Sequence, residues 1–219
     1  MGESWQSGRR VFGGIVLILL FLCPTLARAE EDRAPLEQLQ AFLDRLKSID
    51  ADFTQVVSDP ANGKKTEYKG RFTALRPNLF RWDYQTPYVQ LIVSDGEWIW
   101  HYEPELQQAT RVSVKQMEKT PAGFLIASRR VEETFDWKAV TDPEWKTPTV
   151  TLRPRQADSN FQEIAVTLDP DGEHIRNMVV VDNLGNRSRF TFHDMRASRS
   201  LDRQSFRFAP PTGVDVVTE

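Results

Sequence analysis

The feature that most constrains the fold is a change in hydrophobic period near Asp50. Before it, apolar side chains recur at steps of three and four residues, which predicts a helix with a single apolar stripe. The stripe consists of Leu36, Leu39, Phe42, Leu43, Leu46 and Ile49. Pro35 suits the first position of this helix, where its missing N–H costs nothing. After Asp50 the period is two, so the remaining chain is predicted to form strands.

The strands are predicted to be short and to be joined mostly in chain order. We expect about ten or eleven of them, the last being FRFAPP at 206–211. Asn62-Gly63, Asp95-Gly96 and Asp171-Gly172 are expected at hairpin turns, because these residues tolerate positive φ. The pattern predicts a mainly β protein in which an antiparallel meander curls on itself.

Residues 115–130 interrupt the alternation with a second helical segment. Thr120 can cap a helix whose first residue is Pro121, with Phe124, Leu125 and Ile126 on or near its apolar side. The sheet is therefore predicted to carry one helix before it and one inserted midway. The sequence has no internal repeat and no sign of a second domain.

The first 29 residues are predicted to be a cleaved signal peptide. Arg9 and Arg10 precede an apolar run at 11–22, and Ala27 and Ala29 stand at the spacing of a cleavage site. The run is shorter than the about 20 residues that a membrane span needs. The paired arginines also match part of a twin-arginine signal, and we favour the general secretory route.

Cys23, at the end of the apolar run, is expected to be discarded with the signal peptide. The alternative is a lipid attachment site, which Leu22 and Pro24 on either side disfavour. Residues 30–219 would then form one domain without cysteine. Removing residues 1–29 takes away three arginines and one glutamate, leaving 25 basic and 30 acidic residues and a net charge of −5. That balance argues against a nucleic-acid partner.

Two predicted strands carry rows of aromatic side chains. One row is Phe80, Trp82 and Tyr84, and the other is Trp98, Trp100 and Tyr102. Periodicity leaves two alternatives open for them, a filled core or the wall of an apolar cavity. Arg76 precedes the first row. Its planar fork of donors can hold a helix end or loop by the carbonyls, or it can form a surface ion pair worth about 0–1 kcal/mol.

No enzyme is predicted. The chain has neither a G-x-S-x-G nor an H-E-x-x-H motif, and His101, His174 and His193 are scattered without metal-ligand spacing. We therefore expect no catalytic residues, no metal and no cofactor.

Several blocks of the sequence together resemble the periplasmic outer-membrane lipoprotein carrier (LolA) family. The blocks are ADFTQVV (51–57), RPNLFRW (76–82), LIVSDGEWIWHYEPELQQA (91–109), TPAGFLIA (120–127) and FRFAPPTGVDV (206–216). They occur in the right order, and the resemblance extends from about Leu36 to the C-terminus.

This resemblance implies an unclosed antiparallel β-barrel with a helical lid over an apolar cavity. It also implies a soluble, monomeric carrier in the periplasm. Members take triacylated lipoproteins from an inner-membrane ABC-type release complex, shield the acyl chains and deliver the cargo to an outer-membrane receptor. Two alternatives stay open: the anchored outer-membrane receptor of the same fold, which would keep a lipidated Cys23, and a generic periplasmic binder of fatty acids or other lipids. A stress sensor of similar fold would need a second domain.

The resemblance also assigns roles to residues. The arginine of the Arg-Pro block, here Arg76, latches the lid. Phe80 lies near the cavity mouth and influences docking on the release complex. Trp82 lies on the concave side. Phe124 and Leu125 match lid positions. The other residues expected to line the cavity are Tyr84, Trp98, Trp100, Leu39, Phe42 and Leu43.

Overall fold

One long helix is followed by strands, as the change of period predicts. The computed structural model describes residues 24–126, 129–142 and 146–219. Most of the predicted signal peptide, Cys23 included, lies outside these residues. Helix α1 (Pro24–Arg45) runs through the predicted cleavage point, so in a processed chain it would begin at Glu30.

The predicted bounds of this helix are wrong at both ends. Pro35 lies inside α1, not at its first position, because good helix formers such as Leu26, Ala27 and Glu30 extend the helix backwards. Ile49 continues the apolar pattern but belongs to the first strand, since the helix ends at Arg45.

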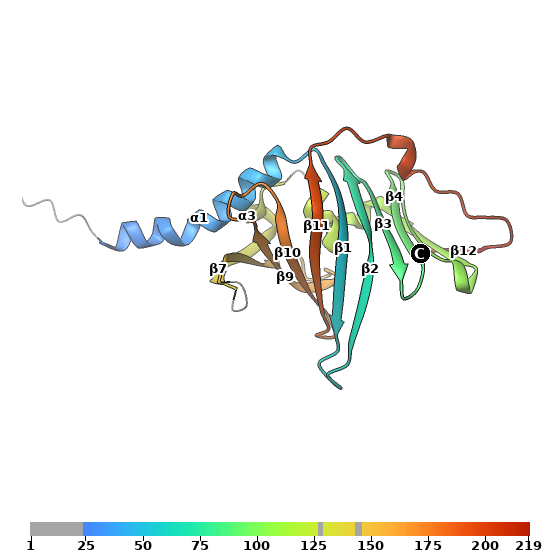
Figure 1. Ribbon diagram of the computed structural model, residues 1–219, viewed down its shortest axis with the longest axis horizontal. Helices are drawn as coiled ribbons and strands as arrows, with labels where there is room; N and C mark the ends of the chain where they lie inside the picture. The colour runs from blue at the N-terminus through green and yellow to red at the C-terminus, as the bar shows by residue number, and fades with distance from the viewer. Residues whose placement is uncertain (1–23, 127–128, 143–145) are drawn as a thin grey trace, which may run out of the picture.

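Twelve strands form one sheet in the described part of the chain (Figure 1). The first six are β1 (Ser48–Ser58), β2 (Lys65–Leu75), β3 (Leu79–Thr86), β4 (Gln90–Asp95), β5 (Trp98–Glu103) and β6 (Gln108–Ser113). The others are β7 (Phe135–Thr141), β8 (Pro148–Pro154), β9 (Phe161–Leu168), β10 (Ile175–Asp182), β11 (Arg187–Ala197) and β12 (Asp215–Thr218). Their spatial order is β12-β6-β5-β4-β3-β2-β1-β11-β10-β9-β8-β7.

The sheet consists of two meanders joined by the long-range antiparallel pair β1–β11. Strands β7 and β12 are the two ends of the order, so the sheet curls without closing. This confirms the predicted mainly β, unclosed antiparallel barrel. Strand β12 is an exception, because it pairs parallel to β6. The expected strand at 206–211 is wrong: most of this segment is extended chain outside the sheet, and Pro210 and Pro211 lack the N–H that a ladder needs.

The three predicted hairpin turns are present. Gly63, Gly96 and Gly172 adopt φ values of 69°, 97° and 72° between β1 and β2, β4 and β5, and β9 and β10. Gly70 in β2 has a different role. A Cβ added there would lie 1.9 Å from the backbone oxygen of Asp83, at a register shift between β2 and β3.

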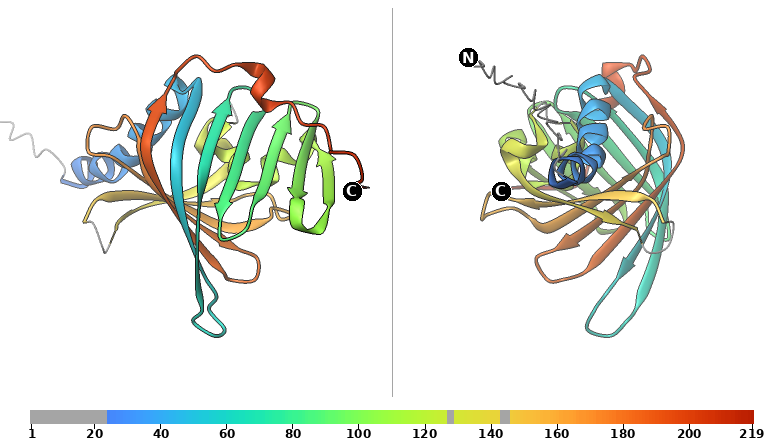
Figure 2. Two further views of the ribbon diagram at one scale, coloured as in Figure 1. Left: turned by 45° about the vertical axis from the view of Figure 1, so that its right-hand side comes forward. Right: turned by 90° about the vertical axis from the view of Figure 1, so that its left-hand side faces the viewer.

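The inserted segment is a series of short helices. They are η2 (Val114–Lys119), α2 (Pro121–Ile126) and α3 (Val131–Thr134), and two further 3₁₀ turns lie elsewhere, η1 (Pro104–Leu106) and η3 (Arg203–Phe206). The predicted cap is confirmed, because the Thr120 hydroxyl accepts from the N–H of Gly123 at 3.1 Å. Helix α1 and the inserted segment lie on the inner side of the curved sheet (Figure 2).

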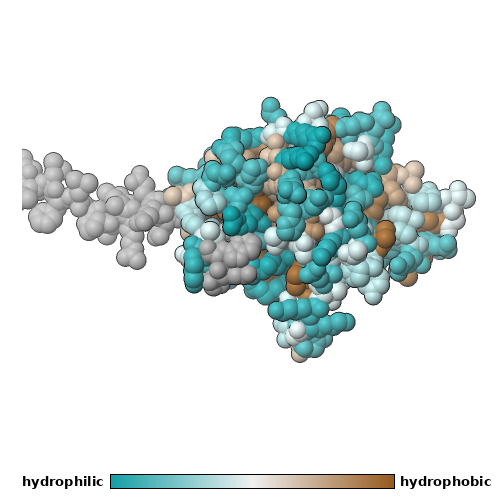
Figure 3. All heavy atoms as spheres, in the orientation of Figure 1, coloured by the Kyte–Doolittle hydropathy of each residue, from teal (hydrophilic) through white to brown (hydrophobic). Residues whose placement is uncertain are grey.

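The outer face of the sheet is mostly hydrophilic over β1, β2 and β11 (Figure 3). Among the described residues, no helix combines the length and the apolar character needed to cross a bilayer.

The close approach at Gly70 predicts a large effect of Gly70→Ala. The backbone of β3 would have to move, so we expect a loss of about 2 kcal/mol or more in the free energy of unfolding. Gly63→Ala is the control: no neighbour lies within 4 Å of its added Cβ, which leaves only the positive φ, at about 1 kcal/mol. Urea unfolding measures both, and equal losses would contradict the packing argument.

Candidate functional site

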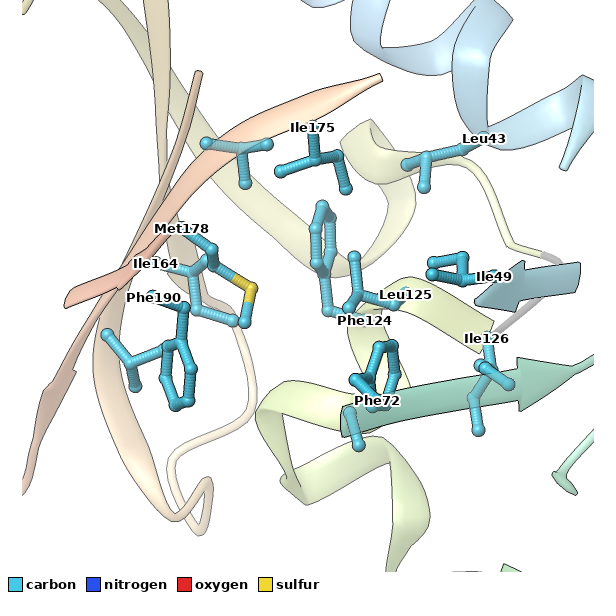
Figure 4. Packing of buried hydrophobic residues seen from close by; sticks show 14 of the residues in the cluster. Leu43, Ile49, Phe72, Phe124, Leu125, Ile126, Ile164, Ile175, Met178 and Phe190 are labelled. Carbon is cyan, nitrogen blue, oxygen red and sulfur yellow. The ribbon is translucent and has the colours of Figure 1, made fainter. Parts of the chain in front are cut away.

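The concave face of the sheet is apolar and is covered by the helices. Side chains from β2, β9, β10 and β11 meet side chains from α1 and α2 in one buried cluster (Figure 4). The sheet supplies Phe72, Ile164, Met178 and Phe190, and the helices supply Leu43, Phe124, Leu125 and Ile126. The two layers therefore share a single hydrophobic core.

Most of the predicted cavity residues belong to this cluster. They are Phe80, Trp82, Tyr84, Leu39, Phe42, Leu43, Phe124 and Leu125. Phe53 of β1, which the sequence analysis did not single out, lies among the aromatic rings. Its ring centre is 5.8 Å from that of Trp82 and 5.2 Å from that of Tyr84, both edge to face. The alternation in ADFTQVV was the available signal, since it places Phe53 on the buried face.

Trp98 and Trp100 do not join these residues, which corrects their assignment to the cavity. Trp100 pairs across the ladder with Val93, and Val93 pairs with Arg81, so these three side chains share one face. Trp82 follows Arg81 in β3 and therefore points to the opposite face. It packs in a separate cluster against Phe208, with the ring centres 5.4 Å apart. Both rows alternate correctly, but cross-strand register puts them on different faces.

The concave face is largely filled in this arrangement. Leu39 and Leu125 are fully buried, and the pocket beside the helices, lined in part by Leu43, Phe124, Val131 and Phe135, has a volume of about 40 Å³. A second pocket, between α1 and strands β8 and β9, has a volume of about 230 Å³. The aromatic row on β3 is therefore packed as a core here. It can line an open cavity only when α1 or the inserted segment moves away from the sheet.

Arg76 links the two helices that cover this face. It follows β2, and its N–H donates to the Lys47 carbonyl at 2.9 Å. Its guanidinium donates to the Leu43 carbonyl through Nη1 at 2.6 Å, and to the Leu125 carbonyl through Nε at 3.3 Å and Nη2 at 2.9 Å. Both acceptors lie in the last turn of their helices, where carbonyls commonly lack partners within the helix. The Leu43 carbonyl also accepts from the N–H of Leu46 at 3.3 Å.

Burial sets the electrostatics of this link. Desolvation lowers the pKa of Arg76 from its ordinary value, and the nearby Asp44 carboxylate opposes that shift. An arginine stays charged under such conditions, so its bonds to the two carbonyls are charge-assisted and stronger than neutral ones.

Gly123 lets α2 approach η2 closely. A Cβ added at this position would lie 2.0 Å from the Met117 carbonyl oxygen, so only glycine fits. This role of Gly123 could not be predicted from the sequence pattern, although Gly123 lies inside the block TPAGFLIA. Close backbone approach leaves no periodic signal in a sequence.

The histidines do not come together. Within the described part of the chain, His174 forms a group with Asp169 and Asp171 in the β9–β10 turn, and their possible ligand atoms lie within 4.8 Å of one another. Asp169 already forms an ion pair with Arg176 at 2.6 Å.

Residues 44–209 match the family model for the outer membrane lipoprotein carrier protein LolA. The chain is 36% identical over 205 residues to the outer-membrane lipoprotein carrier protein of Methylibium petroleiphilum, with 92% of this chain and 97% of that protein covered. It is 34% identical over 205 residues to the protein of that name from Methylococcus capsulatus, with 92% and 95% covered. The chain belongs to the LolA family.

The family match confirms the resemblance read from the sequence blocks. The matched range contains Arg76, Phe80, Trp82, Phe124 and Leu125, and it leaves most of α1 outside. Among solved structures, a LolA superfamily protein from Nitrosomonas europaea is 12% identical, with a TM-score of 0.48 over 81% of this chain and 97% of that one. A conserved protein from Thermus thermophilus is 16% identical, with a TM-score of 0.49 over 88% and 99%.

Tyr84 provides a pH-dependent test of the closed core. Burial, with a smaller contribution from Tyr68, raises the pKa of the Tyr84 phenol above its ordinary value. Because the unfolded state ionises first, this contribution to stability is complete below about pH 10 and is lost as the pH rises through the raised folded pKa. We expect the free energy of unfolding to fall less steeply above pH 10 in Tyr84→Phe, by up to about 1.4 kcal/mol per pH unit.

Tyr88→Phe is the matched control, since Tyr88 is 59% exposed. Urea unfolding at a series of alkaline pH values measures the slopes. Identical slopes for the wild type and Tyr84→Phe would show that Tyr84 ionises as easily in the folded as in the unfolded protein.

Proposed function

We propose that this protein is a soluble periplasmic carrier of acylated lipoproteins. It takes triacylated lipoproteins from an inner-membrane ABC-type release complex and delivers them, as a monomer, to an outer-membrane receptor. Membership of the LolA family supports this proposal. The observation that carries it is the Arg76 guanidinium, which holds α1 and α2 by hydrogen bonds over an apolar concave face.

The cargo defines what such a carrier must do. Each buried methylene is worth about 0.8 kcal/mol, so one long acyl chain exposed to water costs on the order of 10 kcal/mol. Lipoproteins do not leave a membrane unaided at that cost. The concave face, with Phe53, Phe72 and Trp82 among its rings, offers a large apolar area with few rotamers to freeze.

Release requires that the carrier's own side chains compete with the cargo. In the closed arrangement Leu39, Leu125 and their neighbours occupy the concave face, so acyl chains have to displace them. The apparent affinity then falls by the fraction of molecules that are open. We infer that Arg76 sets this fraction, that loading is driven by the release complex, and that unloading runs downhill to the receptor.

The carrier proposal also gives roles to Phe80 and to the two parts of the chain. Phe80 is 2% exposed beneath the helices, so it becomes available at the cavity mouth for docking only when they move. Residues 1–29 act as an export signal, and residues 30–219 form the carrier domain. The protein acts on its cargo by binding alone and is not an enzyme.

Lipoprotein release from spheroplasts tests the function directly. We expect newly made lipoprotein to leave the inner membrane only when the purified protein is added. Binding of free fatty acid without lipoprotein release would indicate a generic lipid binder. A mature protein that begins at an acylated Cys23, measured by mass, would indicate the anchored receptor.

Arg76→Leu should separate loading from delivery. The variant loses the charge-assisted bonds to Leu43 and Leu125, so the lid opens more readily while the sheet stays folded. We expect an acyl-chain fluorophore to bind about tenfold more tightly, which corresponds to about 1.4 kcal/mol. Loaded protein should accumulate, and transfer to outer-membrane vesicles should fail.

Arg153→Leu is the control, because the Arg153 side chain is 74% exposed and pairs only with Glu163 among the described contacts. Fluorophore titration and a vesicle transfer assay measure both variants. Normal delivery by Arg76→Leu would refute the latch.

A further inference from the structure

Gln40 is a buried polar residue on the covering side of α1. Its side chain is 8% exposed, although glutamine is mostly found on surfaces. The amide Nε2 donates to Asp44 Oδ1 at 2.7 Å, and Oε1 accepts from the backbone N–H of Val131 at 2.9 Å. One side chain thus joins α1 to a residue 91 positions further along the chain.

Val131 is the first residue of α3, so its N–H has no partner within that helix. Val131 is also 2% exposed, so with Gln40 in place its N–H is shielded from solvent. The bond is therefore the one that satisfies a buried donor. Its loss would leave this N–H without an acceptor, a much larger cost than the loss of a solvated hydrogen bond.

Gln40 and Arg76 fasten different parts of the inserted segment to the same helix. Arg76 holds Leu125 at the end of α2, whereas Gln40 holds Val131 at the start of α3. Asp44 lies between them on α1, since it accepts from Gln40 and acts electrostatically on Arg76. The small pocket beside the helices is lined by both Phe124 and Val131, so it lies between the two attachment points.

An ion pair next to Gln40 also connects α1 to α3, but it contributes less. Arg33 Nη2 lies 2.8 Å from Glu132 Oε1, with the two side chains 47% and 34% exposed. Solvent screens such a pair and reduces its contribution. Gln40 is the desolvated contact at this end of the segment.

We propose that Gln40 is a second latch of the lid, a positioning residue that holds α3 on α1 as Arg76 holds α2. The inference rests on the proposed function, in which the lid opens for cargo. Two separate attachment points mean that either end of the inserted segment can open while the other stays closed. Entry of an acyl chain between them would then proceed in two steps, with the pocket near Phe124 and Val131 as the starting point.

Gln40→Met tests this latch. Methionine keeps the length and volume but neither hydrogen bond, so Val131 and Asp44 lose their partner. We expect an acyl-chain fluorophore to bind about tenfold more tightly, because the competent fraction rises. Gln38→Met is the matched control, since Gln38 is exposed on the same helix.

The effect of Gln40 on lid opening can also be measured without cargo, as the distance between α1 and α3. Spin labels at Ala41→Cys and Glu133→Cys, both exposed, follow the separation of α1 and α3 in a Cys23→Ser background, which removes the chain's single cysteine. In the unloaded protein, Gln40→Met should shift the distances to longer values, and Gln38→Met should not. Gln40→Asn, one methylene too short to bridge, should act in the same direction if Gln40→Met folds poorly.

The outcomes separate the latch from the carrier function. Unchanged distances and an unchanged fluorophore Kd in the Gln40 variants would overturn the latch, as would a lower unfolding temperature without tighter binding, since that is the signature of a purely structural residue. If the variants open and bind as expected but wild-type protein releases no lipoprotein from spheroplasts, the latch stands and the carrier function fails.

Discussion

The concave face of the sheet is apolar, and the sheet does not close. Other parts of the chain therefore have to shield this face from water. Strands β7 and β12 remain the two ends of the strand order, so the curl leaves an opening. Helix α1 and the segment from η2 to α3 fill it from the inside, and their side chains join those of Phe72 and Phe190 in one core. In the structure these helices complete the packed core, and in the proposed function their movement exposes the apolar concave face.

Burial of apolar surface gives this cover most of its stability. It does little to fix the position of the helices, because the hydrophobic free energy is roughly proportional to the buried area and is not directional. A few directional bonds fix its place. Arg76 reaches the last turns of α1 and α2, and Gln40 reaches the first residue of α3. Each such bond contributes about 0.5–3 kcal/mol, which is small beside the burial of a long acyl chain. For the proposed carrier, these magnitudes allow cargo to displace the cover and the cover to return when the cargo leaves.

The local features of this arrangement can be predicted from the sequence, but few of the contacts between distant residues can. Alternation predicts the strands and the buried side of Trp82. For Arg76 the residues alone leave open both a contact with helix-end carbonyls and a surface ion pair, and only the family resemblance favours the first. The face occupied by Trp100 depends on its register with Val93, which no single strand encodes. The contact between Gln40 and Val131 joins residues whose sequence neighbourhoods give no sign of each other. Strand β12 is short and each of its residues is exposed, so it lacks the alternation of buried and exposed residues that reveals a strand.

Among the described residues, two apolar patches of the sheet are covered, and they are covered in different ways. On the convex side, Phe208 packs on Trp100, and the chain beyond it is fixed by the β12–β6 ladder and by Arg111, which donates to Thr218 and lies 4.4 Å from the ring centre of Trp98. A ladder satisfies successive backbone groups, so that cover can leave only by losing a whole strand pairing. On the concave side the helices satisfy most of their own backbone internally, and side chains such as Arg76 and Gln40 make the connections. If the protein opens as the proposed function requires, this difference favours the concave cover, which can move without unfolding an edge of the sheet.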